Sequence, residues 1–392
     1  MKPTDLIDLG PLAQIALLAA ALATLPLVWL AWRHRGASTP QRLRALTLVT
    51  LFLTFDLVLF GAFTRLTDSG LGCPDWPGCY GNASPFGAVH QITQAQTAMP
   101  TGPVTHGKAW IEMIHRYLAT GVGALLTVLM GWSLLAVRRL RRSDPAQARL
   151  VAPGWAALTF AWVCLQGAFG ALTVTMKLYP AIVTGHLLGG IGLLALLAVQ
   201  TRRHAPQPLV LSATLRAAVW AVLGLVVLQV ALGGWVSTNY AVLACQDVPT
   251  CQGQWWPPMD FEAGFTLKRG LGVQADGSAL PFAALTAIHV THRIGAVVVL
   301  TVLGLLMAAL RQPAPRYARG LLAIAALQLL TGLSNIVLGW PLLAAVAHTG
   351  GAAALVTLLA ALLAHSHHAS APSPAASASP ASSHLPSAAL SR

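Results

Sequence analysis

Long apolar segments constrain this chain more than any other feature of its sequence. Nine segments have about the 20 residues that an α-helix needs to cross a hydrocarbon core of about 30 Å. With 56% hydrophobic and 9% charged residues, the chain lies outside the range of soluble domains. We therefore predict an all-α polytopic protein surrounded by membrane lipid. Its spans are expected at residues 11–32, 45–64, 109–137, 151–173, 181–200, 217–237, 282–310, 320–340 and 342–364.

Arginines are unevenly distributed among the connections between these spans, and cytoplasmic connections retain Lys and Arg. One alternate set of connections carries Arg33, Arg35, Arg42, Arg44, Arg138, Arg139, Arg141, Arg142, Arg149, Arg202, Arg203, Arg216, Arg311, Arg316 and Arg319. The opposite set carries only Arg65, Lys108, Lys177, Lys268 and Arg269. We therefore expect the amino terminus and the loops 65–108 and 238–281 outside, and the carboxyl terminus in the cytoplasm. The net charge of +13 then reflects topology, which argues against nucleic-acid binding.

The two ends of the chain indicate where it resides. The start, MKPTDLIDLG, has neither a basic cluster followed by a cleavable apolar core nor an Arg-rich presequence. We therefore predict a multi-pass protein of the bacterial inner membrane with a periplasmic amino terminus. Residues 365–392 are rich in Ala, Ser, Pro and His and are predicted to form a disordered cytoplasmic tail, because they offer little large apolar surface.

An internal repeat divides the membrane part of the chain. GLGCPDWPGCYG (70–81) and ACQDVPTCQG (244–253) carry cysteine pairs at the same spacing, and EMIHRYLATGVG (112–123) parallels HVTHRIGAVVV (289–299). The sequence thus predicts two pseudo-symmetric four-helix bundles at 45–200 and 217–364, related as a parallel repeat. Residues 1–44 add one transmembrane helix and a cytoplasmic loop, and 201–216 form a cytoplasmic linker.

Histidines recur at one depth in both units, about 9–15 Å from the outward end of their helices. His115 and His186 occupy the second and fourth helices of the first unit, and His292 and His348 those of the second. A single intramembrane histidine is often only a hydrogen-bonding group. Because neutral imidazoles on facing helices can ligate haem iron, the recurrence favours two bis-histidine haem sites.

Charged side chains accompany these histidines. Arg116 and Arg293 each follow a histidine, and we predict that they bind haem propionates, with snorkelling toward headgroups as the alternative. Glu112 stands three residues before His115, so it shares the face of that ligand and is the candidate for catalytic proton transfer; pairing with Arg116 or Lys108 is the alternative.

Three further polar or sulfur-containing side chains lie within the spans. His289 occupies the corresponding position of the second unit, and its role is open. Asp56, within a span, is either functional or hydrogen-bonded to a neighbouring helix. Cys164 is interpreted as a small buried apolar residue.

These motifs together resemble the haem A synthase family over about residues 45–364. The resemblance rests on GAFTRLTDSGLGCPDW (61–76), EMIHR (112–116), GH (185–186), HR (292–293) and HTG (348–350). Members of that family are duplicated four-helix bundles that oxidise the C8 methyl of haem O to the formyl group of haem A for terminal oxidases. The extra first helix departs from the eight-helix members, and no role for it follows.

The resemblance implies a role for each unit. The first would take haem O, the substrate, between His115 and His186, with Glu112 catalytic in two successive hydroxylations followed by loss of water. The second would keep haem b between His292 and His348. Haem A is the product, and haem O synthase and the assembly of the terminal oxidase are the implied partners. The electron acceptor is not named by the sequence; a quinone is one candidate.

Outer-loop disulfides are also a family feature, which implies the pairs Cys73–Cys79 and Cys245–Cys251. An outward position allows a disulfide to persist, and the lack of a third cysteine or nearby histidine disfavours zinc. Both a structural role as a cap over the histidines and a redox role stay open.

Two other functions share some of these features. A dihaem cytochrome b that exchanges electrons with quinone would use the same four histidines without modifying haem. A transporter built from two repeats is disfavoured, because the spans lack paired Gly/Pro breaks at mid-depth.

Overall fold

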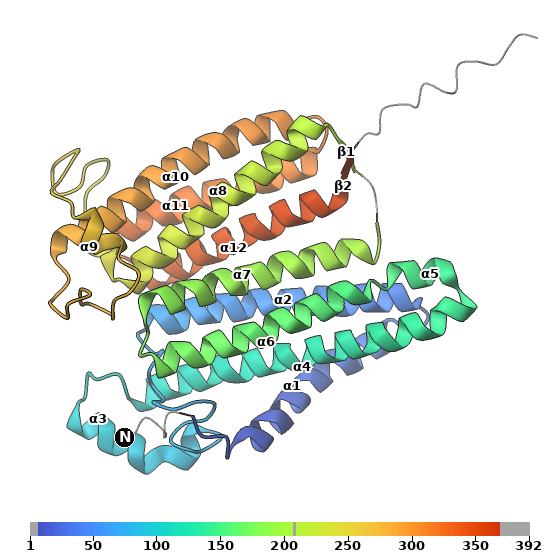
Figure 1. The fold of residues 1–392 in the computed structure, drawn as a ribbon, viewed down its shortest axis with the longest axis horizontal. Helices are drawn as coiled ribbons and strands as arrows, with labels where there is room; N and C mark the ends of the chain where they lie inside the picture. Colours follow the sequence, from blue (N-terminus) through green and yellow to red (C-terminus); the bar gives the residue numbers. More distant parts are fainter. Residues whose placement is uncertain (1–6, 207–208, 369–392) are drawn as a thin grey trace, which may run out of the picture.

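The computed structural model describes residues 7–206 and 209–368, and nearly all of its regular structure is helical (Figure 1). The long helices are α1 (Leu12–Arg33), α2 (Thr39–Leu66), α4 (His106–Ser143), α6 (Pro153–Thr175), α7 (Pro180–Arg203), α8 (Ala213–Thr238), α10 (Phe282–Leu310), α11 (Pro315–Val337) and α12 (Leu342–His365). The short elements are η2 (Pro85–Ala88), α3 (Val89–Ala98), α5 (Pro145–Leu150), η3 (Ala241–Leu243), α9 (Phe261–Phe265), β1 (Leu209–Leu211) and β2 (Ser366–His368).

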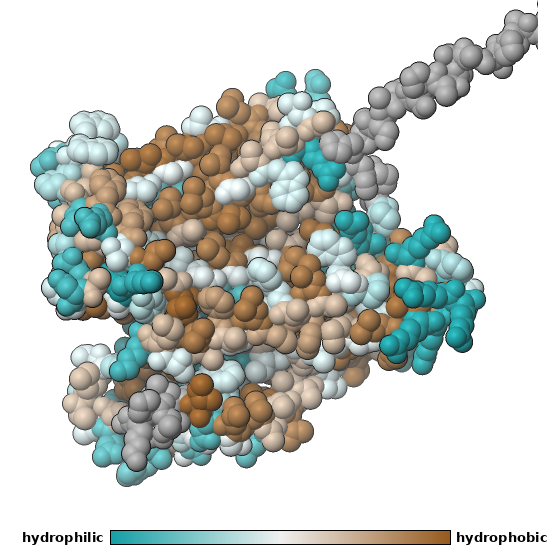
Figure 2. Space-filling view, in the orientation of Figure 1, coloured by the Kyte–Doolittle hydropathy of each residue, from teal (hydrophilic) through white to brown (hydrophobic). Residues whose placement is uncertain are grey.

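The predicted spans correspond to helices long and apolar enough to cross a membrane, nine of them in the described part of the chain. The face of the molecule shown in Figure 2 has a broad hydrophobic region along the helices and hydrophilic residues toward both of their ends. Helix boundaries differ from the predicted ones where polar residues continue a helix beyond its apolar part. Thus α4 starts at the Thr105 cap, whose hydroxyl accepts from the Lys108 amide at 3.2 Å, and continues through the Arg-rich segment to Ser143.

Contacts between the long helices fall into two groups. Helices α2, α4, α6 and α7 pack on one another, as do α8, α10, α11 and α12, and α1 lies against α4. The groups meet where α12 packs on α7 and α2, and α8 on α7. Buried Val, Leu and Ala side chains fill the interior, in one cluster centred on α8, α10 and α12 and another on α1, α2 and α4.

The loops between α2 and α4 and between α8 and α10 lie at one end of the helices, together with the start of α1 (Figure 1). The Asp8 amide donates to Trp76 O at 3.0 Å, which ties the beginning of the described chain to the first loop. At the opposite end, β1 pairs in parallel with β2. The first residues of the predicted tail therefore have regular structure, since His365 ends α12 and Ser366–His368 form β2. The rest of that predicted disordered tail, 369–392, lies outside the described residues.

Polar contacts join the two helix groups at the loop end. Arg65 Nη2 donates to Ser237 O at 2.6 Å, and its Nη1 lies 3.1 Å from the Asp68 carboxylate. The Tyr240 hydroxyl donates to the same carboxylate at 2.6 Å. The end of α2 is therefore bound directly to the end of α8.

Candidate functional site

Each of the four predicted histidine ligands lies against a glycine of a neighbouring helix. A Cβ added at the glycine would lie 3.0 Å from Cε1 for Gly61 and His115, 3.6 Å for Gly170 and His186, 3.0 Å for Gly233 and His292, and 3.3 Å for Gly332 and His348. The glycine stands on the first or third helix of a unit and the histidine on the second or fourth. At Gly61, Gly233 and Gly332 this distance is shorter than ordinary van der Waals contact, so a larger residue would press on the imidazole, whereas at Gly170 it is an ordinary contact.

His115 lies near His186, and His292 lies near His348. Within each pair the two rings are near enough for their charges to interact. All four side chains keep partial exposure although their helices are embedded in the bundle. The Nδ1 atoms of His115 and His186 are buried without a partner among residues 7–206 and 209–368. The donor set therefore fits two bis-imidazole sites; ligation itself stays a prediction.

Glutamines support three of the four histidine positions. Gln166, Gln229 and Gln328 each stand four residues before one of the glycines that contact a histidine. Their side chains lie against a second glycine, which follows the histidine by three residues; these second glycines are Gly189, Gly295 and Gly351. Gln229 Nε2 also donates to His292 O at 2.9 Å. The exception is His115, which has Leu118 in place of that glycine.

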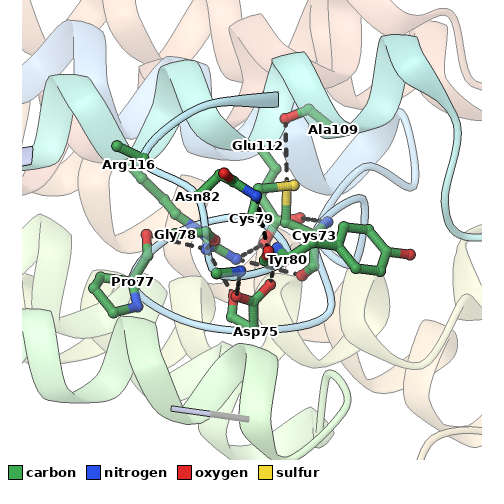
Figure 3. Close-up of a disulfide and its surroundings, with 12 residues drawn as sticks. Cys73, Asp75, Pro77, Gly78, Cys79, Tyr80, Asn82, Ala109, Glu112 and Arg116 are labelled. Atoms are coloured by element: carbon green, nitrogen blue, oxygen red, sulfur yellow. Dashed lines mark hydrogen bonds and ion pairs between the residues drawn. A yellow bond between two sulfur atoms is a disulfide. The ribbon is translucent and has the colours of Figure 1, made fainter. Parts of the chain in front are cut away.

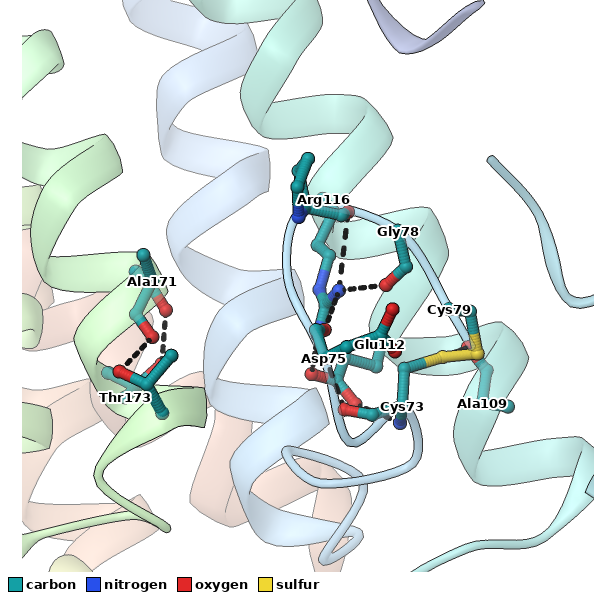
Figure 4. Close-up of polar contacts among 12 residues, drawn as sticks. Cys73, Asp75, Gly78, Cys79, Ala109, Glu112, Arg116, Ala171 and Thr173 are labelled. Carbon is teal, nitrogen blue, oxygen red and sulfur yellow. Dashed lines mark hydrogen bonds and ion pairs between the residues drawn. A yellow bond between two sulfur atoms is a disulfide. The ribbon is translucent and has the colours of Figure 1, made fainter. Parts of the chain in front are cut away.

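Glu112 is buried, with 4% of its surface exposed, and its carboxylate has two partners. Oε2 accepts from the Cys73 amide at 2.8 Å, and Oε1 lies 2.5 Å from Arg116 Nη2. These partners come from α4 itself and from the loop folded over it (Figures 3 and 4). The acid predicted to be catalytic thus stands in the first unit, one turn from His115, beneath the first loop.

Arg116 binds that loop. Nη1 donates to the carbonyl oxygens of Asp75, at 2.8 Å, and Gly78 (Figure 4). Arg293 does the same in the second loop, where Nη1 donates to Asp247 O at 2.8 Å and Nη2 to Cys245 O at 2.9 Å. The predicted contact of these two arginines with propionates stays a prediction, since their terminal nitrogens bind the loops here.

Both disulfides are formed, Cys73–Cys79 and Cys245–Cys251. Each closes a loop around an aspartate that the sequence analysis did not single out. The Asp75 carboxylate accepts from the amides of Tyr80 and Gly81 at 2.6 and 2.7 Å, where both residues have left-handed φ values of 51° and 73° (Figure 3).

The second loop repeats this turn. The Asp247 carboxylate accepts from the amides of Gln252 and Gly253 at 2.7 and 3.0 Å, again with positive φ at both residues. The Thr250 hydroxyl and these amides lower the pKa of Asp247 to about 2. The shared pattern C-x-D-x-P-x-C, present in both loops, was the signal that could have identified the two aspartates.

The remaining candidates, His289, Asp56 and Cys164, differ in environment. His289 is buried, and its Nδ1 lacks a partner within the described residues. Asp56 is exposed on α2. Cys164 is exposed on α6, so the prediction that it is buried was wrong. The Cys164 side chain faces the outside of the bundle, where lipid replaces protein neighbours.

Arg269, in the loop between α8 and α10, was not predicted to be functional. Only 2% of its surface is exposed, and its Nη2 donates to Asn239 Oδ1 at 2.6 Å. Nε and Nη1 have no partner in the described parts of the chain, and burial lowers the pKa of this guanidinium. Its unpaired donors suit a carboxylate.

Comparison with known proteins finds one matching family and several similar proteins. Residues 44–360 match the family described as cytochrome oxidase assembly protein (COX15-CtaA). The chain is 40% identical over 317 residues to a Heme A synthase of Shewanella oneidensis, which covers 79% of this chain and 92% of that protein. It is 29% identical over 343 residues to a Heme A synthase of Allorhizobium ampelinum, covering 82% and 90% of the two chains. A Heme A synthase of Sinorhizobium medicae is 28% identical over 332 residues, or 80% and 86%.

Proposed function

Because this chain belongs to the COX15-CtaA family of cytochrome oxidase assembly proteins, we propose that it is a haem A synthase that oxidises the C8 methyl of haem O to the formyl group of haem A. Relatives named Heme A synthase support this choice of substrate and product. One observation carries the proposal. Four histidines lie against glycines in two matched pairs, and within residues 7–206 and 209–368 only the first pair has a buried carboxylate one turn away.

Haem O would bind between His115 and His186, and haem b between His292 and His348. Imidazole nitrogens are suitable axial ligands, and the glycines let neighbouring helices approach the rings closely. The Nδ1 atoms of the first pair have no partner within the described residues, so no hydrogen bond at Nδ1 fixes the tautomer of either ring. Haem b, when bound, would supply a one-electron redox centre in the second unit, with a quinone as a candidate acceptor.

Glu112 would act on the substrate in the first site. With water as the oxygen source, conversion of the methyl to the formyl group would remove four protons and four electrons. The electrons would leave through haem b to two quinone molecules, and a buried carboxylate is a suitable acceptor for the protons. The Cys73 amide and Arg116 fix this carboxylate at the loop end of α4. In the second unit the corresponding residue is His289, which leaves that site without the acid and supports its role in electron transfer.

The first loop would close the site toward water. Arg116 and Asp75 bind its backbone at several carbonyls and amides, and the buried disulfide restricts it further. A loop bound at so many points excludes solvent from Glu112 and positions it at the same time. We assign the disulfide to this structural role.

We further propose that residues 45–200 and 217–364 form parallel four-helix repeats in the bacterial inner membrane. The amino terminus and the disulfide loops would face the periplasm, and the carboxyl terminus the cytoplasm. The position of both loops at one end, opposite the arginine-rich ends of the helices, supports this orientation (Figure 1). Haem O synthase and the terminal oxidase under assembly are the proposed partners.

The experiment that tests the function is co-expression with a haem O synthase in cells that lack haem A, followed by mass spectrometry of extracted haems. We expect haem A to appear. If the folded, haem-loaded protein yields only haem O and haem B, the proposal is wrong, and a dihaem cytochrome b that exchanges electrons with quinone becomes the better assignment.

The role of Glu112 is tested with Glu112→Gln, which keeps an oxygen for the Cys73 amide but cannot take up a proton. We expect haem A formation to fall at least about 100-fold, the usual contribution of a general base, while bound haem is retained. Glu262→Gln, on the exposed surface of α9, is the matched control and should remain active. Loss of all haem in Glu112→Gln would instead make Glu112 a structural residue.

A further inference from the structure

The fourth-helix histidines, His186 and His348, occupy equivalent positions but have different neighbours at Nδ1. Both lie against a third-helix glycine, Gly170 on α6 and Gly332 on α11. Four residues before each of these glycines stands a glutamine, Gln166 or Gln328. Each glutamine contacts a second glycine, Gly189 or Gly351, which follows the histidine by three residues. This common register makes the residue immediately before each glycine equivalent in the two units.

That residue is Thr331 on α11. Its Oγ1 donates to Leu327 O at 2.7 Å and lies 3.0 Å from His348 Nδ1. A hydroxyl has one proton, and here the backbone carbonyl accepts it. Toward the imidazole Thr331 is therefore an acceptor, so Nδ1 carries the ring proton and Nε2 keeps its lone pair.

The equivalent residue on α6 is Phe169, which cannot accept a hydrogen bond. His186 Nδ1 is buried and has no partner among the residues that the structure describes. His115, on the other side of the first site, also lacks an Nδ1 partner there, whereas His292 Nδ1 lies 2.9 Å from Gln229 Nε2. An amide nitrogen donates, so this contact does not place the ring proton of His292 on Nδ1 as Thr331 does for His348. The difference that carries the argument is therefore the one between the two fourth-helix histidines.

We propose that Thr331 is a positioning residue that holds His348 in the tautomer able to ligate haem iron, so that the second site retains its haem. Phe169, by contrast, leaves His186 without such a restraint, so that the first site releases its haem readily. A site that must exchange substrate for product needs this weaker hold. The inference rests on the proposed function, in which the first site handles substrate and the second keeps haem b.

The expected size follows from the general effect of partners that orient metal-ligating histidines, whose removal costs about 10–100-fold in metal affinity. Thr331→Val keeps the shape of the side chain and removes the acceptor. We therefore expect haem b to leave Thr331→Val about 10–100 times faster than the unmodified protein. Because an Nδ1–H partner makes imidazole a stronger donor to ferric iron, we also expect the haem b midpoint potential to rise.

The experiment uses the full-length protein, purified in detergent with bound haem b. Haem loss is followed optically as transfer to excess apomyoglobin, and the midpoint potential by redox titration. Thr331→Ser, which keeps the hydroxyl, should restore both values. Thr357→Val on α12 is the matched control, since Thr357 Oγ1 bonds a carbonyl four residues earlier, Ala353 O at 2.7 Å, as Thr331 does. It should leave both values unchanged.

Unchanged haem loss and potential in Thr331→Val would overturn the proposal, as would equal changes in Thr357→Val. Phe169→Thr provides a gain-of-function arm, in which release of haem from the first site should slow; release at the unmodified rate, with the protein folded, would count against the role of Phe169. Haem A is assayed in parallel. Its absence from every variant, with the Thr331→Val effects intact, would overturn the proposed function and leave the positioning role of Thr331 standing.

Discussion

Replacement of Gly72 by alanine should release the first disulfide loop from α4. A Cβ added at Gly72 would lie 2.5 Å from both Lys108 O and the Ala109 amide nitrogen. These are backbone atoms within the first turn of α4, so the helix cannot relax as a flexible side chain would. The loop must therefore move away from the helix, and the bond from the Cys73 amide to Glu112, 2.8 Å long, is stretched or broken.

The magnitude follows from two costs. Overpacking against a rigid neighbour costs about 1–3 kcal/mol, and loss of a hydrogen bond to a charged group costs about 1.5–3 kcal/mol. We take about 3 kcal/mol as the change in the free energy of loop opening. At about 1.4 kcal/mol per factor of ten, the open state becomes about 100 times more populated.

Reduction of the Cys73–Cys79 disulfide measures this opening, because both cysteines are 0% exposed in the closed loop. The rate is obtained with a phosphine reductant and maleimide mass labelling in detergent, and Cys245–Cys251 in the same molecule is the internal reference. Gly107→Ala is the matched control, since a Cβ there would meet nothing within 4 Å. If Cys73–Cys79 is reduced equally fast in Gly72→Ala and Gly107→Ala, the loop is not held by contact with α4 and the reasoning fails.

Two further predictions concern the second unit. The pKa of Asp247 is about 2 in the folded loop against an ordinary 3.8, so its carboxylate stabilises the loop above about pH 4, and this contribution is lost as the pH falls toward 2. Phosphine reduction of the second disulfide should therefore accelerate over that pH range. In Asp247→Asn the reduction should already be fast at pH 7. Gly233→Ala places a Cβ 3.0 Å from His292 Cε1 and should lower haem b content, measured by pyridine haemochrome, about tenfold, whereas Gly224→Ala, with open space around it, should not.

The fold could be predicted to a large extent because a bilayer imposes a length and an apolar composition on every span. The predicted span 282–310 coincides with α10, and the other spans differ from their helices mainly at the ends. Those differences arise where caps and charged residues set the helix boundary, as at Thr105, which caps α4, and at Ser143, which ends it. Hydropathy marks where the hydrocarbon ends and not where the backbone stops being helical.

The sequence by itself determined the spans, the set of four histidines, the cysteine pairs and the family, because each depends on residue type and spacing along the chain. Only the tertiary structure decided what the side chains bind. Arg116 contacts carbonyls some forty residues earlier in the chain, and Thr331 on α11 contacts His348 on the neighbouring helix α12. Such partners depend on how loops fold back and on which faces of neighbouring helices meet, and no local pattern specifies either. The difference between a restrained and an unrestrained histidine is therefore visible only in the folded protein.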